Sequence, residues 1–243
     1  MQGLLYLFLL NLGICLITSN QASAKVSMED VKESIGCTNP LDCKFMERDI
    51  RRDSKQCLQH PEEVFELAQR WPSTENPLSI NGSIRYLGLF PKKYHYRISR
   101  DSAGKVHVTT SIHFRDASPK LLANLKTKMK EAERIWEMYT PEDLEIDFHF
   151  NVVESKQEAD YSVHLKSRTR GPYDTAWDPN WRPLSMAHEL GHMMGLDDEY
   201  KNRPGGGDSS KCFRYSLMCS SGDPAASPRK YYYYLILRRA YCA

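Results

Sequence analysis

Hydrophobic residues beyond position 100 follow two different periods. Apolar and polar residues alternate over residues 106–114, and the alternation returns over residues 144–153. Between these segments, apolar residues recur every three or four positions from Leu121 to Trp136, shortly after Pro119. Alternation places side chains on opposite faces of a strand, whereas the longer spacing lines one face of a helix. The pattern therefore predicts a strand, a helix and a second strand in this order.

Shorter segments extend this pattern on both sides. Residues 94–98 and 161–165 are typical of strands. We expect a further helix to begin close to Leu184 and a last helix to cover residues 226–239. This succession of strands and helices predicts a domain of the α/β (α+β) class.

The first residues have the pattern of a signal peptide. Residues 4–17 form an almost unbroken apolar run, too short to span a bilayer comfortably, and small residues follow at 22–24. We expect residues 1–24 to be removed on export, with an uncleaved anchor as the alternative. No later apolar run is long enough to cross a membrane, so we expect no stable membrane insertion after cleavage. The mature protein would be secreted to the extracellular space, or to the periplasm in a Gram-negative bacterium.

A charged segment lies between the expected signal peptide and the patterned domain. Residues 25–77 contain helical stretches such as 61–68, and a proline-bracketed sequence at 71–77 ends them. We interpret residues 25–77 as a small helical N-terminal appendage and a candidate prosegment. Residues 78–243 form the expected main domain.

Six cysteines follow residue 24, three in the appendage and three near the C-terminal end. In an exported protein an even number of cysteines indicates disulfides. Because three is odd, complete pairing requires at least one bridge between the two groups. The most economical pattern has a short bridge between Cys212 and Cys219, a bridge within the appendage and a long bridge to Cys242. The appendage cysteines are Cys37, Cys43 and Cys57.

Two histidines four positions apart, His188 and His192, predict a metal site. On a helix they lie one turn apart on one face, so both imidazoles can bind one ion, and Glu189 can act as a general base. A catalytic zinc usually has three protein ligands. Gly195 can end the helix in the left-handed region and turn the chain back toward the metal. Asp198, three positions after this glycine, is the expected third ligand.

This arrangement resembles the extended signature of the metzincin zinc peptidases, in the HExxHxxGxxD variant of the snapalysin-like members. The sequence Asp198-Glu199-Tyr200 also resembles, after a shift of one residue, the ending of certain bacterial immunoglobulin-cleaving metallopeptidases. Metzincins have a methionine in a tight turn below the metal, and Met218 stands at the matching place. The resemblance implies a mixed twisted sheet, a zinc-binding helix, a methionine turn and a C-terminal helix.

The same resemblance implies a zinc endopeptidase with one catalytic Zn²⁺ and a protein or peptide substrate. Glu189 would accept a proton from the attacking water. A substrate strand would lie antiparallel to an edge strand before the zinc helix, which we expect near residues 173–177. Tyr173 and Trp177 are therefore candidate substrate-binding residues. We expect the protein to be a monomer.

The alternative function is a secreted binding protein or toxin component that keeps the zinc fold without catalysis. Glu189 argues against it, because a structural zinc needs no general base and is held by four protein ligands. The net charge of +2 gives no broad positive field, so we expect no nucleic-acid partner. The basic and tyrosine-rich residues 229–239 are interpreted as helix packing with basic ends that reach the solvent. The remaining histidines are not assigned to metal: His60, His95, His107, His113, His149 and His164.

Overall fold

The structure is a computed structural model that describes residues 26–37, 39–66, 71–86, 90–141, 144–167, 175–200, 212–213 and 215–242. The helices are α1 (Met28–Ile35), α2 (Pro40–Arg52), α3 (Pro61–Glu66), α4 (Pro119–Glu137), α5 (Pro183–Met193) and α6 (Lys230–Arg238), with a short 3₁₀ helix η2 (Lys156–Glu158). The strands are β1 (Leu78–Tyr86), β2 (Phe90–Arg100), β3 (Val106–Arg115), β4 (Ile146–Val152), β5 (Tyr161–Leu165) and β6 (Ala176–Trp177).

Strand β3 is the centre of the sheet, whose order is β1-β2-β3-β5-β6 with β4 also paired to β3. β1 and β2 form a long antiparallel hairpin, and β2 pairs antiparallel with the first residues of β3. β4 and β5 run parallel to β3, and β6 runs parallel to β5. The sheet is therefore mixed. The predicted α/β class and the strands predicted at 94–98, 106–114, 144–153 and 161–165 are confirmed.

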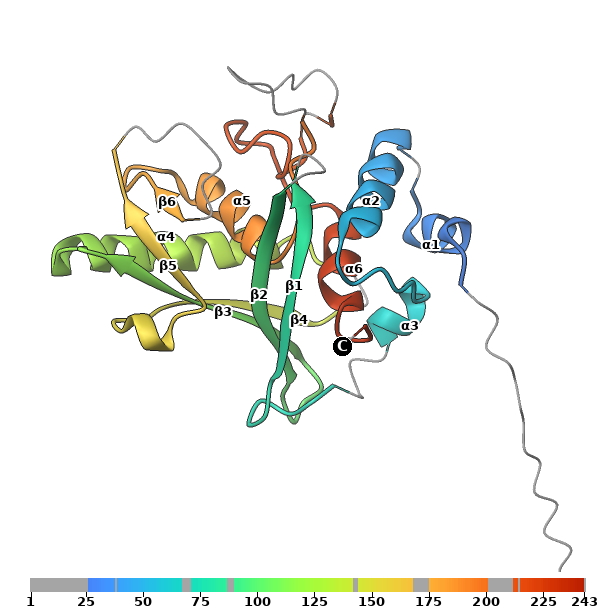
Figure 1. Cartoon of the computed structure of the whole chain (residues 1–243), viewed down its shortest axis with the longest axis horizontal. Coiled ribbons are helices and arrows are strands. Elements are labelled where there is room, and N and C mark those ends of the chain that lie inside the picture. Colours follow the sequence, from blue (N-terminus) through green and yellow to red (C-terminus); the bar gives the residue numbers. More distant parts are fainter. Residues whose placement is uncertain are drawn as a thin grey trace, which may run out of the picture.

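Helices α4 and α5 cover one face of the sheet (Figure 1). Alternate residues of β4, including Phe148 and Phe150, are buried. Trp136 of α4 contacts both layers: its ring centroid lies 5.3 Å from that of Phe148, and its indole nitrogen donates to the carbonyl of Ala187 in α5 at 3.1 Å. Because truncation of a fully buried tryptophan typically costs about 3–5 kcal/mol, this side chain holds α5 firmly against the sheet.

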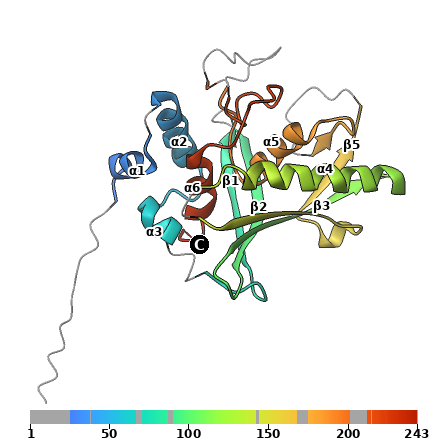
Figure 2. The same ribbon diagram turned by 180° about the vertical axis from the view of Figure 1, so that it is seen from behind.

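Helices α1, α2 and α3 gather beside α6 and away from the outer end of α4, as two opposite views show (Figures 1 and 2). Tyr234 of α6 donates a hydrogen bond to the carbonyl of Gln59 at 2.8 Å. Tyr94 of β2 donates to the Asp53 carboxylate, directly after α2, at 2.7 Å. The segment expected to be an appendage therefore shares the core of the main domain.

The basic end of the last helix differs from the expectation. Arg238 and Arg239 were expected to reach the solvent, but both are fully buried. Each donates to Oδ2 of Asp53, at 2.7 Å from Arg238 and 2.6 Å from Arg239. The expectation is wrong because a buried carboxylate from the N-terminal segment supplies the negative charge that both guanidinium groups require.

One strand and one helix boundary also differ from the prediction. Strand β1 was not predicted, because Asn81 and Gly82 interrupt its alternation with residues that disfavour strands. The last helix begins at Lys230 rather than at residue 226, because Ser227 pairs with Ser216 in an isolated bridge. These residues are extended and cannot join the helix.

The described residues contain two disulfides. Cys212–Cys219 closes a short loop that contains Met218, as expected. Cys57–Cys242 joins the N-terminal segment to the C-terminal end, which confirms the expected long bridge and identifies its partner. The expected bridge within the appendage is wrong, because Cys57 is bonded to Cys242 and Cys37 and Cys43 are not bonded to each other. The Cys43 thiol instead donates to the carbonyl of Cys37 at 3.0 Å.

No helix in the described part of the chain is long and apolar enough to cross a membrane. The expected signal peptide at residues 1–24 lies outside the described residues.

The long disulfide predicts how the chain behaves after a single cut. Residues 73–77 are exposed, so a protease should cleave there. Because Cys57 and Cys242 lie on opposite sides of the cut, the two pieces should migrate as one species on a denaturing, non-reducing gel. They should separate when a reductant is added. The Cys242→Ser variant is the control and should give two pieces without reductant; two pieces from the unreduced wild type would refute the connectivity.

Candidate metal centre

Helix α5 carries the two histidines of the motif. It begins at Pro183. The fixed φ of proline suits the first helical position, and the N–H group that proline lacks would have no helical partner there in any case. Residues 186–193 are all buried, so the helix passes through the core. His188 and His192 lie one turn apart, with ring centroids separated by 4.7 Å and ring planes at 84°.

Backbone hydrogen bonds determine which nitrogen of each imidazole faces the site. Nδ1 of His188 bonds the carbonyl of Leu217, and Nδ1 of His192 bonds the carbonyl of Leu196, both at 2.9 Å. A carbonyl oxygen only accepts hydrogen bonds, so each Nδ1 must carry a proton. In the neutral rings the lone pair is then on Nε2, as metal binding requires.

Asp198 completes the cluster from beyond the end of the helix. Its Oδ1 lies 3.3 Å from Nε2 of His188 and 3.2 Å from Nε2 of His192. Ligand atoms around a tetrahedral zinc, each about 2.0–2.1 Å from the metal, are about 3.3 Å apart. The structure thus brings the three predicted ligands together, all buried, and both separations from Asp198 to the histidines suit a zinc ion.

The turn that brings Asp198 back is a Schellman motif at the end of α5. The amides of Gly195 and Leu196 bond carbonyls of the last helical turn, both at 2.9 Å. Gly195 has a φ of 81°, and a Cβ at this position would lie 2.6 Å from the Tyr94 ring and 2.8 Å from Nη1 of Arg239. Both the backbone conformation and the available space therefore require glycine.

Met218 lies directly against helix α5, which carries the two histidines. A Cβ on Gly191 would lie 2.6 Å from the Met218 sulfur, so the thioether contacts the helix backbone next to His192. Met218 is fully buried. Its neighbour Leu217 supplies the carbonyl that orients His188. Leu217 and Met218 therefore support the histidine helix both by a hydrogen bond and by packing.

Glu189 lies next to His188 on α5 and is only 9% exposed. Its Oε2 has no hydrogen-bond partner among the described residues. A buried polar atom without a partner typically costs about 1–3 kcal/mol, so this oxygen does not stabilise the fold and can accept a proton or hydrogen bond from a bound group.

Asp197 and Asp198 differ in their contacts, although both are buried. Asp197 forms an ion pair with Arg52 of α2 at 2.7 Å and accepts a hydrogen bond from the amide of Asp198 at 3.0 Å. Arg48 of α2 donates to the carbonyl of Asp198 at 2.7 Å. Helix α2 thus holds Asp197 and Asp198 in place. Of the two aspartates, Asp198, three positions after Gly195, is the one in the cluster.

The sequence analysis did not identify the support behind this loop. Glu199 is buried, and the hydroxyl groups of Tyr231 and Tyr232 donate to its Oε1. Its amide bonds the carbonyl of Met218 at 3.1 Å. Burial raises the pKa of Glu199 more than the tyrosine hydrogen bonds lower it. The only sequence signal was the Asp-Glu-Tyr order, which does not reveal tyrosine partners some thirty positions later.

The cluster itself has perturbed acid–base properties. Burial lowers the pKa of His188, but the hydrogen bond to Asp198 and the charge of Glu189 outweigh it and raise the pKa to about 9. Burial raises the pKa of Asp198, but the charge of His192 and the hydrogen bonds from both histidines hold it well below its usual range. The carboxylate is therefore ionised and attracts a cation, for which protons on the imidazoles compete.

The two candidate substrate-binding residues are not both described. Tyr173 lies outside the described residues. Trp177 belongs to the short strand β6 at the end of the sheet order, which agrees with the expected edge strand. Its ring is fully buried, 5.6 Å from the ring of Phe114 and 6.0 Å from that of Trp181. The Trp177 side chain therefore belongs to the core.

Comparison of the chain with protein-family models, with curated proteins and with solved structures gives no match.

The conformation of Gly195 predicts a large loss of stability on substitution. Gly195→Ala should lower the free energy of unfolding by about 2–5 kcal/mol, because it adds left-handed strain to a collision with Tyr94. Gly104→Ala is the matched control: φ is 96°, but no atom lies within 4 Å of the new Cβ, so only about 1–2 kcal/mol should be lost. Chemical denaturation of both variants measures the difference, and equal losses would refute the close contact at Gly195.

The two adjacent aspartates should separate metal binding from stability. Asp198→Asn should weaken Zn²⁺ binding by more than about 100-fold, because it removes a charged ligand. Asp197→Asn should keep most of the zinc affinity and lower the free energy of unfolding by about 1–3 kcal/mol, because the Arg52 partner is partly exposed. Metal titration and denaturation of both proteins test this, and the reverse order of zinc affinities would show that the register is wrong.

Proposed function

We propose that the protein is a zinc-dependent endopeptidase in which His188, His192 and Asp198 hold the metal and Glu189 is the general base. The observation that carries this proposal is that one Asp198 carboxylate oxygen lies 3.2–3.3 Å from Nε2 of both histidines, with the three ligand atoms within 4.8 Å of one another. Three protein ligands leave one position of a tetrahedral ion for water or substrate, as in catalytic zinc sites.

The donors suit zinc better than the hard cations. Calcium and magnesium prefer oxygen ligands, whereas two imidazoles and one carboxylate are typical of zinc and other borderline metals. The Nδ1–H groups of both histidines donate to backbone carbonyls, as is usual for histidines that bind zinc. The residues present therefore fit the ion.

Each side chain of the cluster has a separate task in the proposed hydrolysis. A bound zinc would polarise the scissile carbonyl and acidify the attacking water. Glu189 accepts the proton of that water and delivers it to the leaving amine. The carboxylate of Asp198 supplies one negative charge, which strengthens the binding of a dication. Leu196 and Leu217 keep the histidine lone pairs directed at the metal through their carbonyl groups.

A peptide is the substrate class that the neighbouring strand supports. β6 pairs with β5 on one side and stands last in the strand order, directly before α5. An extended peptide can add to such an edge through main-chain hydrogen bonds. We propose that this edge binds substrate and, with the expected signal peptide, that the enzyme is secreted and acts on extracellular protein.

A binding protein that keeps the zinc fold without catalysis is the second candidate function. Glu189 separates the two, because its Oε2 has no hydrogen-bond partner in the described part of the chain. A structural site would gain nothing from such a group. We therefore favour the peptidase.

Substitution of Glu189 tests the proposed function. Glu189→Ala and Glu189→Gln should bind zinc as the wild type does and lose about 10²–10⁴-fold in hydrolysis, because both remove the general base. Fluorescent casein or a peptide library is the substrate, and metal content is measured on the same samples.

The control for this experiment is Glu158→Gln, an exposed residue of η2 outside the metal cluster, which should retain full activity. A metal-loaded Glu189→Ala protein with full activity would remove Glu189 from the mechanism. A zinc-loaded wild type that cleaves no member of the library would favour the binding function.

A further inference from the structure

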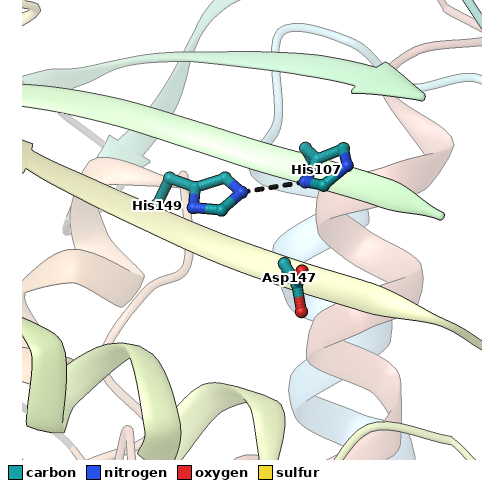
Figure 3. Close-up of side chains that lie close together, drawn as sticks. All are labelled: His107, Asp147 and His149. Carbon is teal, nitrogen blue, oxygen red and sulfur yellow. Dashed lines mark hydrogen bonds between the residues drawn. The ribbon is translucent and has the colours of Figure 1, made fainter. Parts of the chain in front are cut away.

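The face of the sheet opposite α4 carries a second cluster of metal-binding side chains. His107 is the second residue of β3, and Asp147 is its register partner on the parallel strand β4. His149 lies two residues further along β4 and projects from the same face. Figure 3 shows the two imidazoles directed toward each other with the carboxylate beside them.

We propose that His107, Asp147 and His149 form a second binding site for a divalent transition metal, for which zinc is the appropriate probe. One donor atom from each residue lies within 4.8 Å of the others, and all three residues are partly exposed, so an ion can reach them from solvent. Two imidazoles and one carboxylate select borderline metals over calcium or magnesium.

A neighbouring carboxylate prepares His107 for this role. Asp101, in the turn before β3, accepts hydrogen bonds from the amides of Ala103 and Lys105 on its Oδ1, both at 2.9 Å. Its other oxygen, Oδ2, lies 3.3 Å from Nε2 of His107. A carboxylate held in this way places the imidazole proton on Nε2 and leaves the lone pair of His107 on Nδ1, facing His149. This is the carboxylate–histidine arrangement that orients ligands in metal sites.

The hydrogen bond between the two rings shows that they can approach a common ion. Nδ1 of His107 and Nε2 of His149 are 2.8 Å apart, and the ring planes differ by 21°. Around a tetrahedral zinc these atoms would be about 3.3 Å apart, a widening of about half an ångström that small side-chain rotations can supply. The ion would replace this hydrogen bond, and the proton on Nε2 of the neutral His149 ring would move to its Nδ1, so that Nε2 offers its lone pair.

Lys105 should lower the metal affinity of this cluster. Its ammonium group forms an ion pair with Oδ1 of Asp147 at 2.9 Å, and the side chain is 39% exposed. A cation in the cluster would be repelled by this amine and would share its carboxylate. The second site should therefore bind zinc more weakly than the buried cluster at His188, and removal of Lys105 should strengthen it.

Calorimetric titration of the full-length, tag-free protein with zinc tests the proposal. The wild type should bind two equivalents with different affinities. His149→Gln should lose the weaker site or weaken it at least about 10-fold, while its peptidase activity stays at the wild-type level. Lys105→Gln should strengthen the weaker site several-fold. His113→Gln is the matched control, since His113 lies on the same sheet face about 20 Å along β3, and it should change nothing.

This experiment tests the two proposed metal sites independently of each other. His188→Gln should lose the tighter site and the activity while the weaker site remains. Three outcomes would overturn the second site: one equivalent in the wild type, an unchanged second site in His149→Gln, or equal losses in His149→Gln and His113→Gln. The last result would indicate unspecific binding to surface histidines.

Discussion

The candidate metal centre depends on the hydrogen bonds and the ion pair that the buried Arg239 guanidinium forms. The guanidinium donates to the carbonyls of Met194 and Gly195 at 2.6 and 2.7 Å, and to Asp53 at 2.6 Å. The same group lies over the Tyr94 ring, 4.3 Å from its centroid. Removal of one partner of a buried ion pair typically costs about 3–5 kcal/mol, because the remaining charge is left buried without a counter-charge or water. The end of α5, and with it the turn to Asp198, is thus fixed by the C-terminal helix, the N-terminal segment and β2 together.

This dependence changes the interpretation of the N-terminal segment. Removal of residues 25–77 would take away Asp53, the carboxylate with which both Arg238 and Arg239 form ion pairs. It would also remove Arg48 and Arg52, which hold the loop at Asp197 and Asp198. A detachable prosegment covers a finished site, whereas this segment supplies buried charges to the fold that carries the site. We therefore interpret it as a permanent part of the domain, in accord with its disulfide to Cys242.

The sequence predicts what is encoded locally and fails where the partner is distant. Strand β3, helix α4 and strand β4 follow from the spacing of apolar residues within each segment. The cluster at His188 was predictable because its donors occupy one helix and the turn that follows Gly195. The burial of Arg238 and Arg239 was not predictable, since their carboxylate lies some 185 positions earlier. No periodicity or motif connects these positions before the chain has folded.

The same limit explains why His107 and His149 were not assigned to metal. They stand 42 residues apart on two strands, and only the parallel register of β3 and β4 brings them together. The two His–His–Asp clusters also differ in what orients the imidazoles. Backbone carbonyls in the core hold His188 and His192, whereas a turn carboxylate at the surface holds His107. A buried, rigid cluster binds more tightly than a partly exposed one that shares its carboxylate with a lysine. Limited zinc should therefore fill the site of proposed catalysis first, and the sheet face only when zinc is in excess.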